Sequence, residues 1–278
     1  MQLGVRAHDF GKLPLEELAR RIAAKGFSSI QLALSKALPG MEEDVGKLSP
    51  GLAHSIGTTF ARHNIQIAVL GCYINPIHPD PEIRRSSLAR FKEHLRYARD
   101  FGCGIVGTET GSFHADFSFH PDNHSPKGME MLLESINELV AEAEKFGVIV
   151  GLEGVTSYVA SNPERIKYVL DTIGSNILQV IFDPVNLLDA GNYPEQEKII
   201  AQSFALFGDR IAIVHAKDFI LENGQKKTVI AGKGRLDWEL LLRWLKTNKP
   251  GINILLEDTR PDTVDQSVAF IQGVYQKV

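Results

Sequence analysis

Four ionisable residues each follow a short apolar run in the second half of the chain. The runs VIVGL, LQVIF, IAIV and INILL are followed by Glu153, Asp183, His215 and Glu257. Three carboxylates and an imidazole that meet in a poorly hydrated site repel one another and lose hydration. A divalent cation removes this cost, and oxygen ligands with one imidazole suit Mn²⁺, Mg²⁺, Co²⁺ or Zn²⁺. We therefore expect these four residues to bind one divalent metal ion, with Mn²⁺ as the first choice.

The elements that carry these residues follow a repeated pattern of a short apolar run and then a longer helical stretch. Near-continuous apolar runs are typical of parallel strands that are covered on both faces. Strands are expected at 3–7, 29–33, 67–71, 104–108, 148–152, 178–182, 211–214 and 252–256. Helices are expected at 14–25, 50–63, 81–101, 126–146, 163–173, 193–207, 237–247 and 263–276.

Local signals support these boundaries. Ser49-Pro50 and Asn162-Pro163 each place a capping side chain before a proline that fits the first turn of a helix. Glycines that follow helices, at positions 26, 102, 147, 174 and 208, suggest left-handed C-terminal stops.

Eight strand–helix units in 278 residues average about 35 residues each, as a (β/α)₈ barrel requires. An open doubly wound sheet often has a glycine-rich loop after its first strand, and the segment AHDFGKLP lacks that fingerprint. The sequence thus predicts an α/β protein with a single (β/α)₈ TIM barrel domain over residues 1–278. In such barrels the active site lies at the C-terminal ends of the strands, where the four residues would converge.

Composition limits the classes of partner. The formal net charge is −4, which gives no general attraction to nucleic acid or to an anionic membrane surface. The two cysteines do not form a disulfide framework, and the segment MQLGVRAHDFGK does not have the pattern of a signal peptide. No run approaches the ~20 apolar residues of a membrane helix. We expect a cytoplasmic protein without nucleic-acid or membrane partners.

The strand ends GLEG, FDPVN, VHAKD and LLED, with the segments AGKGRLDW and NPIHPDPEIRRSS, give the chain a family resemblance. Over nearly all eight units it resembles the xylose-isomerase-like barrels, which include sugar phosphate isomerases and epimerases. The resemblance implies that Glu153, Asp183, His215 and Glu257 are the metal ligands. It also implies that Glu153 and Glu257 act as acid and base.

The expected positions of the two glutamates agree with this second role. Strands five and eight are three steps apart in an eight-stranded ring, so the carboxylates approach a substrate from different sides. One removes a proton next to a carbonyl while the metal stabilises the enediolate, and the other returns it. Return to the opposite face gives epimerisation, and return to the neighbouring carbon gives isomerisation. We expect a metal-dependent isomerase or epimerase of a small sugar, ketose or polyol-derived carbonyl compound.

Other functions stay open at this point. A dehydratase acting on a keto-polyol or a dehydroshikimate-like acid would begin with the same proton abstraction. An apurinic endonuclease shares the barrel but resembles a pattern richer in histidines, with basic loops. A sugar-binding subunit without turnover would not need all four residues. Family members are often dimers or tetramers, so a homo-oligomer is possible here.

Further residues are candidates for contact with a small carbohydrate substrate: His8, Glu109, Asn186 and Lys217. Ketose 3-epimerases of the family carry a histidine where this chain has Asn186, and a glutamate where it has Val159. The sequence His215-x-Lys217-Asp218 resembles the branch with dehydratase-like and inositol-related enzymes. Lys217 could polarise a carbonyl, hold a carboxylate of the substrate, or form an ion pair with Asp218 or Glu153.

Three features are further from the expected strand ends. Gln31 could orient a metal-bound carboxylate from the second strand. The run Gly232-Lys233-Gly234-Arg235 could cradle a phosphate or lead into the next helix. Loop histidines could belong to a lid over the site: His78, His114, His120 and His124.

Overall fold

Eight parallel strands form a closed barrel in the computed structural model, which describes residues 1–42 and 44–278. Around the ring their order is β1-β10-β7-β6-β5-β4-β3-β2. Their bounds are β1 Gln2–Arg6, β2 Ser29–Leu32, β3 Gln66–Gly71, β4 Ile105–Glu109, β5 Ile149–Glu153, β6 Leu178–Phe182, β7 Ile211–Ala216 and β10 Asn253–Leu256. All eight expected strands are present, and the predicted (β/α)₈ barrel is confirmed.

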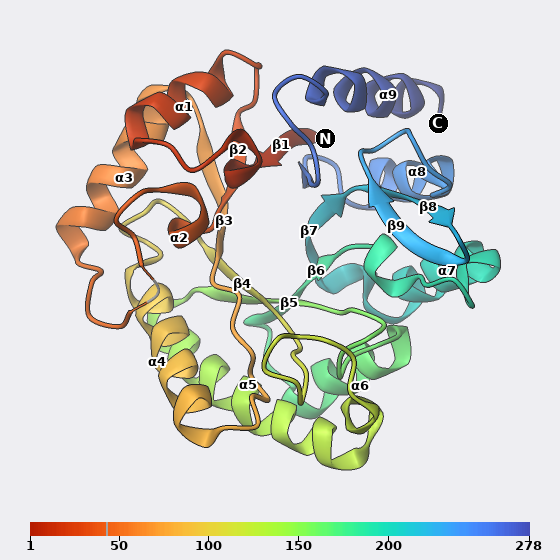
Figure 1. Ribbon diagram of the computed structural model, residues 1–278. Coiled ribbons are helices and arrows are strands. Elements are labelled where there is room, and N and C mark those ends of the chain that lie inside the picture. The colour runs from red at the N-terminus through yellow and green to blue at the C-terminus, as the bar shows by residue number, and fades with distance from the viewer. Residues whose placement is uncertain (43) are drawn as a thin grey trace.

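Helices surround the ring of strands on all sides (Figure 1). The longer ones are α1 Leu15–Ala23, α3 Pro50–Arg62, α4 Pro81–Tyr97, α5 Pro126–Phe146, α6 Pro163–Ile173, α7 Gln196–Phe207, α8 Trp238–Asn248 and α9 Val264–Lys277. Shorter pieces are α2 Leu34–Ala37 and the 3₁₀ turns η1 Ala7–Phe10, η2 Pro121–His124, η3 Val185–Leu187, η4 Tyr193–Glu195 and η5 Gly208–Arg210. Within the described residues, no helix has both the length and the apolar character needed to cross a membrane.

Helix ends follow the sequence signals with one exception. Ser49 accepts a hydrogen bond from Leu52 N, and Asn162 accepts one from Arg165 N, each before a proline in the first turn. Four of the five expected glycine stops have positive φ. Gly208 is the exception, because it continues in right-handed conformation into η5. A Cβ there would lie 2.6 Å from the Trp244 ring, so this glycine provides room for α8.

A β-hairpin interrupts the barrel pattern after β7. It consists of β8 Asp218–Glu222 and β9 Gln225–Val229, which pair in antiparallel register through the turn residues Asn223 and Gly224. Both turn residues have positive φ, 52° and 76°, as a two-residue hairpin turn requires. The long connection expected after the seventh strand therefore has secondary structure of its own.

The buried carboxylate of Asp218 holds the segment that follows this hairpin. It accepts hydrogen bonds from the backbone N–H groups of Phe219, Gly232 and Leu236 and from Trp238 Nε1, at 2.9 to 3.1 Å. Asp218 is 1% exposed, so these bonds are shielded from water. The carboxylate fixes the start of α8 against the barrel.

Replacement of Asp218 by alanine is expected to lower the free energy of unfolding by about 3 kcal/mol or more, because it leaves buried donors unpaired. Chemical denaturation followed by circular dichroism measures this change. The matched control is Asp209→Ala, which removes an 83% exposed carboxylate and is expected to change stability by less than about 0.5 kcal/mol. Equal stability of the two variants would contradict the role of Asp218.

Candidate metal centre

The inward face of the barrel places three of the four candidate ligands. Side chains two positions apart in a strand point to the same face. Ile181, Ile213 and Leu255 belong to a buried cluster inside the barrel, and the residues two positions further along are Asp183, His215 and Glu257. The polar site is therefore built directly on an apolar floor.

Two glycines make space for this floor below the acidic residues of β4 and β5. Gly107 and Gly151 pair in register and precede Glu109 and Glu153 by two positions. A Cβ at Gly107 or Gly151 would lie 2.6 or 2.9 Å from Ile181 Cδ1, which is too close for a side chain. The missing side chains let Ile181 fill the barrel interior, and the glutamates lie above it.

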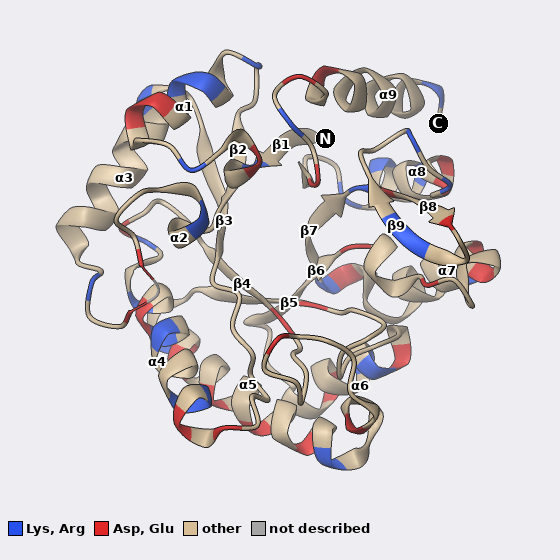
Figure 2. Cartoon of the chain, in the orientation of Figure 1, with Lys and Arg blue, Asp and Glu red and all other residues tan. Residues whose placement is uncertain are grey.

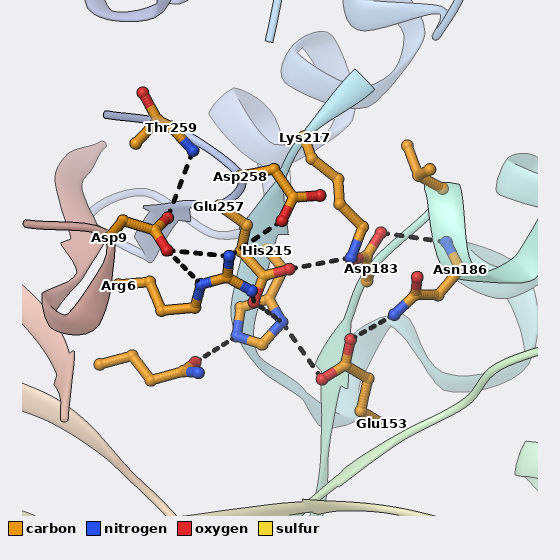
Figure 3. A network of polar contacts seen from close by, with 12 residues as sticks. Arg6, Asp9, Glu153, Asp183, Asn186, His215, Lys217, Glu257, Asp258 and Thr259 are labelled. Carbon is orange, nitrogen blue, oxygen red and sulfur yellow. Dashed lines mark hydrogen bonds and ion pairs between the residues drawn. The ribbon is translucent and has the colours of Figure 1, made fainter. Parts of the chain in front are cut away.

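The four residues predicted to bind metal lie close together (Figure 3). His215 Nδ1 is 3.2 Å from Glu153 Oε2 and 3.4 Å from Glu257 Oε1. Ligand atoms of Glu153, Asp183 and His215 all lie within 4.8 Å of one another, and all three residues are buried. Glu257 borders this group and is 5% exposed. The structure thus brings together the residues of the predicted site.

Lys217 balances part of the negative charge. Its Nζ lies 2.7 Å from Asp183 Oδ2 and 2.8 Å from Glu257 Oε2, so the ion pairs are not those expected with Asp218 or Glu153. Burial alone would lower the pKa of Lys217, but Asp183, Glu257 and Glu153 outweigh it and raise this pKa well above its usual value. Lys217 is therefore a firmly charged ammonium group between two carboxylates.

The same cluster shifts the pKa values of Asp183 and His215. Burial raises the pKa of Asp183, and the charges of Glu153 and Glu257 add to this effect against the opposing charge of Lys217. Burial would lower the pKa of His215, but Glu257 and Glu153 outweigh it and raise this pKa to about 9. The three acids that share this small volume thus favour positive charge on the groups beside them.

The donor atoms fit a divalent cation. His215 Nε2 lies 2.6 Å from Gln31 Oε1, so this nitrogen donates the hydrogen bond and Nδ1 faces the carboxylates. His215 Nδ1 and Asp183 Oδ2 are buried atoms without a hydrogen bond of normal geometry, although each lies beside an opposite charge. Carboxylate oxygens and one imidazole nitrogen are the ligands that Mg²⁺, Mn²⁺ and Zn²⁺ accept.

Gln31 was expected from the sequence to orient a metal-bound carboxylate. In the structure Gln31 contacts His215 instead. Its amide nitrogen donates to Tyr73 Oη at 2.7 Å, and this contact sets which side of the amide faces His215. Groups that fix the tautomer of a metal-binding histidine commonly contribute to metal affinity.

We expect Gln31→Leu to lower the affinity for a divalent ion by about 10–100-fold, because His215 loses the acceptor that fixes its tautomer. Isothermal titration with Mn²⁺ measures the change. Gln31→Glu, which keeps an acceptor oxygen, is expected to retain most of the affinity. An unchanged affinity in Gln31→Leu would show that the contact has no bearing on metal binding.

A cavity of about 480 Å³ opens above the site and contains the candidate substrate contacts. His8, Glu109, Asn186 and Lys217 all belong to its lining. Asn186 Nδ2 donates to Glu153 Oε1 at 2.7 Å, and the backbone N–H of Asn186 donates to Asp183. Asn186 therefore holds two of the acidic residues in addition to facing the cavity.

Burial and Glu153 raise the pKa of Glu109 to about 8, so this carboxyl group is largely protonated at neutral pH. It can donate a hydrogen bond to a ligand oxygen, which an ionised carboxylate cannot.

His8 is the residue whose ionisation is most open to a direct test. Burial lowers its pKa to about 4, and Arg6 and Lys36 add to this effect. The unfolded chain binds the proton near pH 6.5, before the folded chain does, so stability falls as the pH drops from 6.5 toward 4.

Without added metal, the free energy of unfolding is expected to fall between pH 7 and pH 5. The fall in the wild-type protein is expected to exceed that in His8→Gln by at most about 2 kcal/mol. Urea unfolding at the two pH values gives this difference. Parallel pH dependence of the two proteins would show that His8 is not held neutral by the fold.

Several residues of the cavity are absent from the sequence predictions. Arg6 pairs with Asp9 and Asp258 at 2.9 Å and lies 3.6 Å from Glu257 Oε1. Phe117 and Tyr158 form an aromatic wall with ring centroids 5.9 Å apart. The sequence signal for Arg6 was a charged residue within the otherwise apolar run LGVRA.

Phe117 occupies a backbone conformation that phenylalanine rarely adopts. Its φ is 63°, in the left-handed region. Such strain is found most often where a side chain must be placed for function. Here the strained backbone directs an aromatic ring into the lining of the cavity.

The loop histidines occupy other positions. His78 is buried and accepts from Asp80 N, His114 and His120 contact each other edge to face, and His124 Nε2 contacts Thr156 O. None of the four belongs to the described lining of the cavity. Val159 is fully buried and also lies outside that lining. The position at which ketose 3-epimerases of the family carry a glutamate is therefore a core position in this chain.

The run Gly232–Arg235 has little capacity to bind phosphate. Gly232 N is bonded to Asp218, Lys233 N to Ile230 O, and Arg235 N to Phe219 O. A Cβ at Gly234 would lie 2.3 Å from Asp218 Oδ1, so this glycine permits close approach to the buried carboxylate. The run connects the hairpin to α8.

Comparison with known proteins agrees with this architecture. The model of the xylose isomerase-like TIM barrel family matches residues 19–274. The chain belongs to this family. A search of curated proteins gives no sequence match.

Solved structures with the same fold have low sequence identity. D-psicose 3-epimerase from Clostridium cellulolyticum H10, solved with D-tagatose, has a TM-score of 0.73 at 15% identity and covers 99% of this chain and 99% of its own. The 3-keto-D-glucoside 4-epimerase from E. coli has a TM-score of 0.73 at 17% identity, with 98% and 99% covered. A xylose isomerase-like TIM barrel protein from Mycobacterium smegmatis, in complex with magnesium, has a TM-score of 0.74 at 16% identity, with 100% and 96% covered. At this identity the likeness establishes the fold.

Proposed function

We propose that this protein is a divalent-metal-dependent isomerase or epimerase that acts on a small sugar, ketose or polyol-derived carbonyl compound. The observation that carries the proposal is the placement of two carboxylates, Glu153 and Glu257, at 3.2 and 3.4 Å from one histidine nitrogen. β5, which ends at Glu153, and β10, which ends one residue before Glu257, are three steps apart in the ring. The family and its epimerase-containing neighbours support this class of reaction.

Glu153, Asp183, His215 and Glu257 would hold the cation, with Mn²⁺ as our first choice among the ions that fit. A bound divalent cation supplies a Lewis acid that polarises a carbonyl and stabilises negative charge developing on its oxygen. Glu153 and Glu257 then act on the carbon next to that carbonyl: one takes its proton and the other returns a proton from a different side.

Neighbouring side chains prepare the two glutamates for these roles. Asn186 fixes Glu153 through its amide, and Lys217 fixes Glu257 through an ion pair. Burial would raise the pKa of Glu257, but His215, Lys217 and Arg6 hold it well below its usual range. Glu257 therefore remains an ionised proton acceptor throughout the neutral range.

Incubation in D₂O with candidate ketoses, inososes and keto acids tests the proposal. We expect deuterium on the carbon next to the carbonyl of a rearranged product, observed by NMR and mass spectrometry, and only with a divalent ion present. An unsaturated product would replace the proposal with a dehydratase. Absence of exchange across the panel, with metal bound, would remove the support for proton transfer.

A further inference from the structure

The cavity over the metal centre has two different sides. Asp183, which follows β6, and Lys36, in the α2 turn after β2, arise from strands that are diametrically opposite in the ring. Lys36 belongs to the cavity lining, and α2 lies at the rim of the barrel opening (Figures 1 and 2). A ligand that reaches from the candidate metal ligands across the mouth therefore meets Lys36.

Lys36 differs from the other cations of the cavity. Arg6 is paired with Asp9 and Asp258, and Lys217 is paired with Asp183 and Glu257. Within residues 1–42 and 44–278, Lys36 has no carboxylate in ion-pair distance. It is the cation of this lining whose charge is not already neutralised by a described acid.

The side chain of Lys36 is exposed, and its ammonium group lies beside an aromatic ring. Its Nζ lies 5.3 Å from the centroid of the Tyr73 ring, within the range of a cation–π contact. Tyr73 Oη accepts from Gln31, which in turn contacts His215. The ammonium group is thus tied through aromatic and amide side chains to the candidate metal ligand.

Its positive charge reaches neighbouring groups on both sides of the mouth. Burial lowers the pKa of His8, and Arg6 and Lys36 act in the same direction. Burial and Glu153 raise the pKa of Glu109, whereas Lys217 and Lys36 oppose that rise. His8 is kept neutral and therefore adds no negative charge that would repel an anion.

We infer that the substrate carries an oxyanion, a carboxylate or phosphate group, at the end remote from its reacting carbonyl, and that Lys36 binds this group. The inference rests on the proposed function. Recognition of the charged end of the substrate would then take place at the rim formed by β1 to β3, opposite the candidate metal ligands. The aromatic wall of Phe117 and Tyr158 lies on the β4–β5 side and offers no charge to such a group.

Calorimetric titration of the Mn²⁺-supplemented protein with matched ligands tests this inference. The pairs are D-ribulose with D-ribulose 5-phosphate, and D-fructose with its C6 carboxylate, D-fructuronate. We expect one acidic form to bind at least about fivefold more tightly than its neutral parent. Lys36→Gln is expected to abolish that preference. The pair that shows the preference distinguishes phosphate from carboxylate.

Lys227→Gln, which removes a 57% exposed charge on the hairpin, is the matched control and is expected to retain the preference. A preference that persists in Lys36→Gln, equal binding of acidic and neutral forms, or no binding of either acidic form at millimolar concentration would overturn the inference. The proposed function could fail while the inference holds. In that case no ligand would exchange deuterium, but the acidic ligand would still bind in a way that depends on Lys36.

Discussion

Replacement of Glu257 by glutamine is expected to lower kcat by about 10²–10⁴-fold, the usual contribution of a positioned acid or base. Glutamine keeps the size of the side chain and an oxygen near Lys217, but it cannot accept a proton. His215, Lys217 and Arg6 surround the carboxylate and outweigh the effect of burial, so the wild-type group is ionised when substrate binds. Steady-state rates with the substrate found by deuterium exchange measure the loss.

The Glu257→Gln protein gives a second readout, which separates proton transfer from a structural defect. Glu153 is intact in this variant, so deuterium is still expected to enter the isomer whose proton faces Glu153, without conversion to product. Glu222→Gln, with an exposed carboxylate on the hairpin, is the control and is expected to have full activity. Unchanged turnover in Glu257→Gln would defeat the assignment of this residue as acid or base.

Replacement of Asp183 by alanine is expected to reduce affinity for the divalent ion by more than about 100-fold, beyond the 10–100-fold loss typical of an outer hydrogen-bond partner. Asp183 is buried and one of its oxygens lies within 4.8 Å of ligand atoms of Glu153 and His215, so the substitution removes one of the proposed ligands. Equilibrium dialysis with elemental analysis measures bound metal, and circular dichroism checks the fold.

Asp171→Ala is the matched control. It removes an exposed carboxylate near the end of α6 and changes the net charge by the same amount as Asp183→Ala does. It is expected to bind metal as the wild type does. If Asp183→Ala bound one ion with wild-type affinity, the site would have to lie elsewhere in the molecule.

The barrel and the grouping of the four residues could be predicted because both depend on local patterns. Each apolar run has the length of one strand, and Glu153, Asp183, His215 and Glu257 come at the same place relative to the end of a run. Closure of the barrel then brings these ends to one mouth. Residues two positions apart share a face, which is why Ile181 predicts the direction of Asp183.

The remaining features depend on contacts between segments far apart in the chain. The direction of Gln31 toward His215 results from packing across the barrel and from the Tyr73 hydroxyl. Phe117 and Tyr158 reach the cavity through loop conformations that periodicity does not encode. The hairpin was detectable, since Asn223-Gly224 between β8 and β9 is a strong turn signal.

One divalent ion is expected to bind among Glu153, Asp183, His215 and Glu257. Anomalous diffraction from crystals grown with Mn²⁺ tests it most directly. The predicted result is a single strong peak within about 2.0–2.2 Å of His215 Nδ1 and of carboxylate oxygens from this set. A map with no peak at these residues, or a peak bound through His215 Nε2 in place of Gln31, would show that the ion does not bind as proposed.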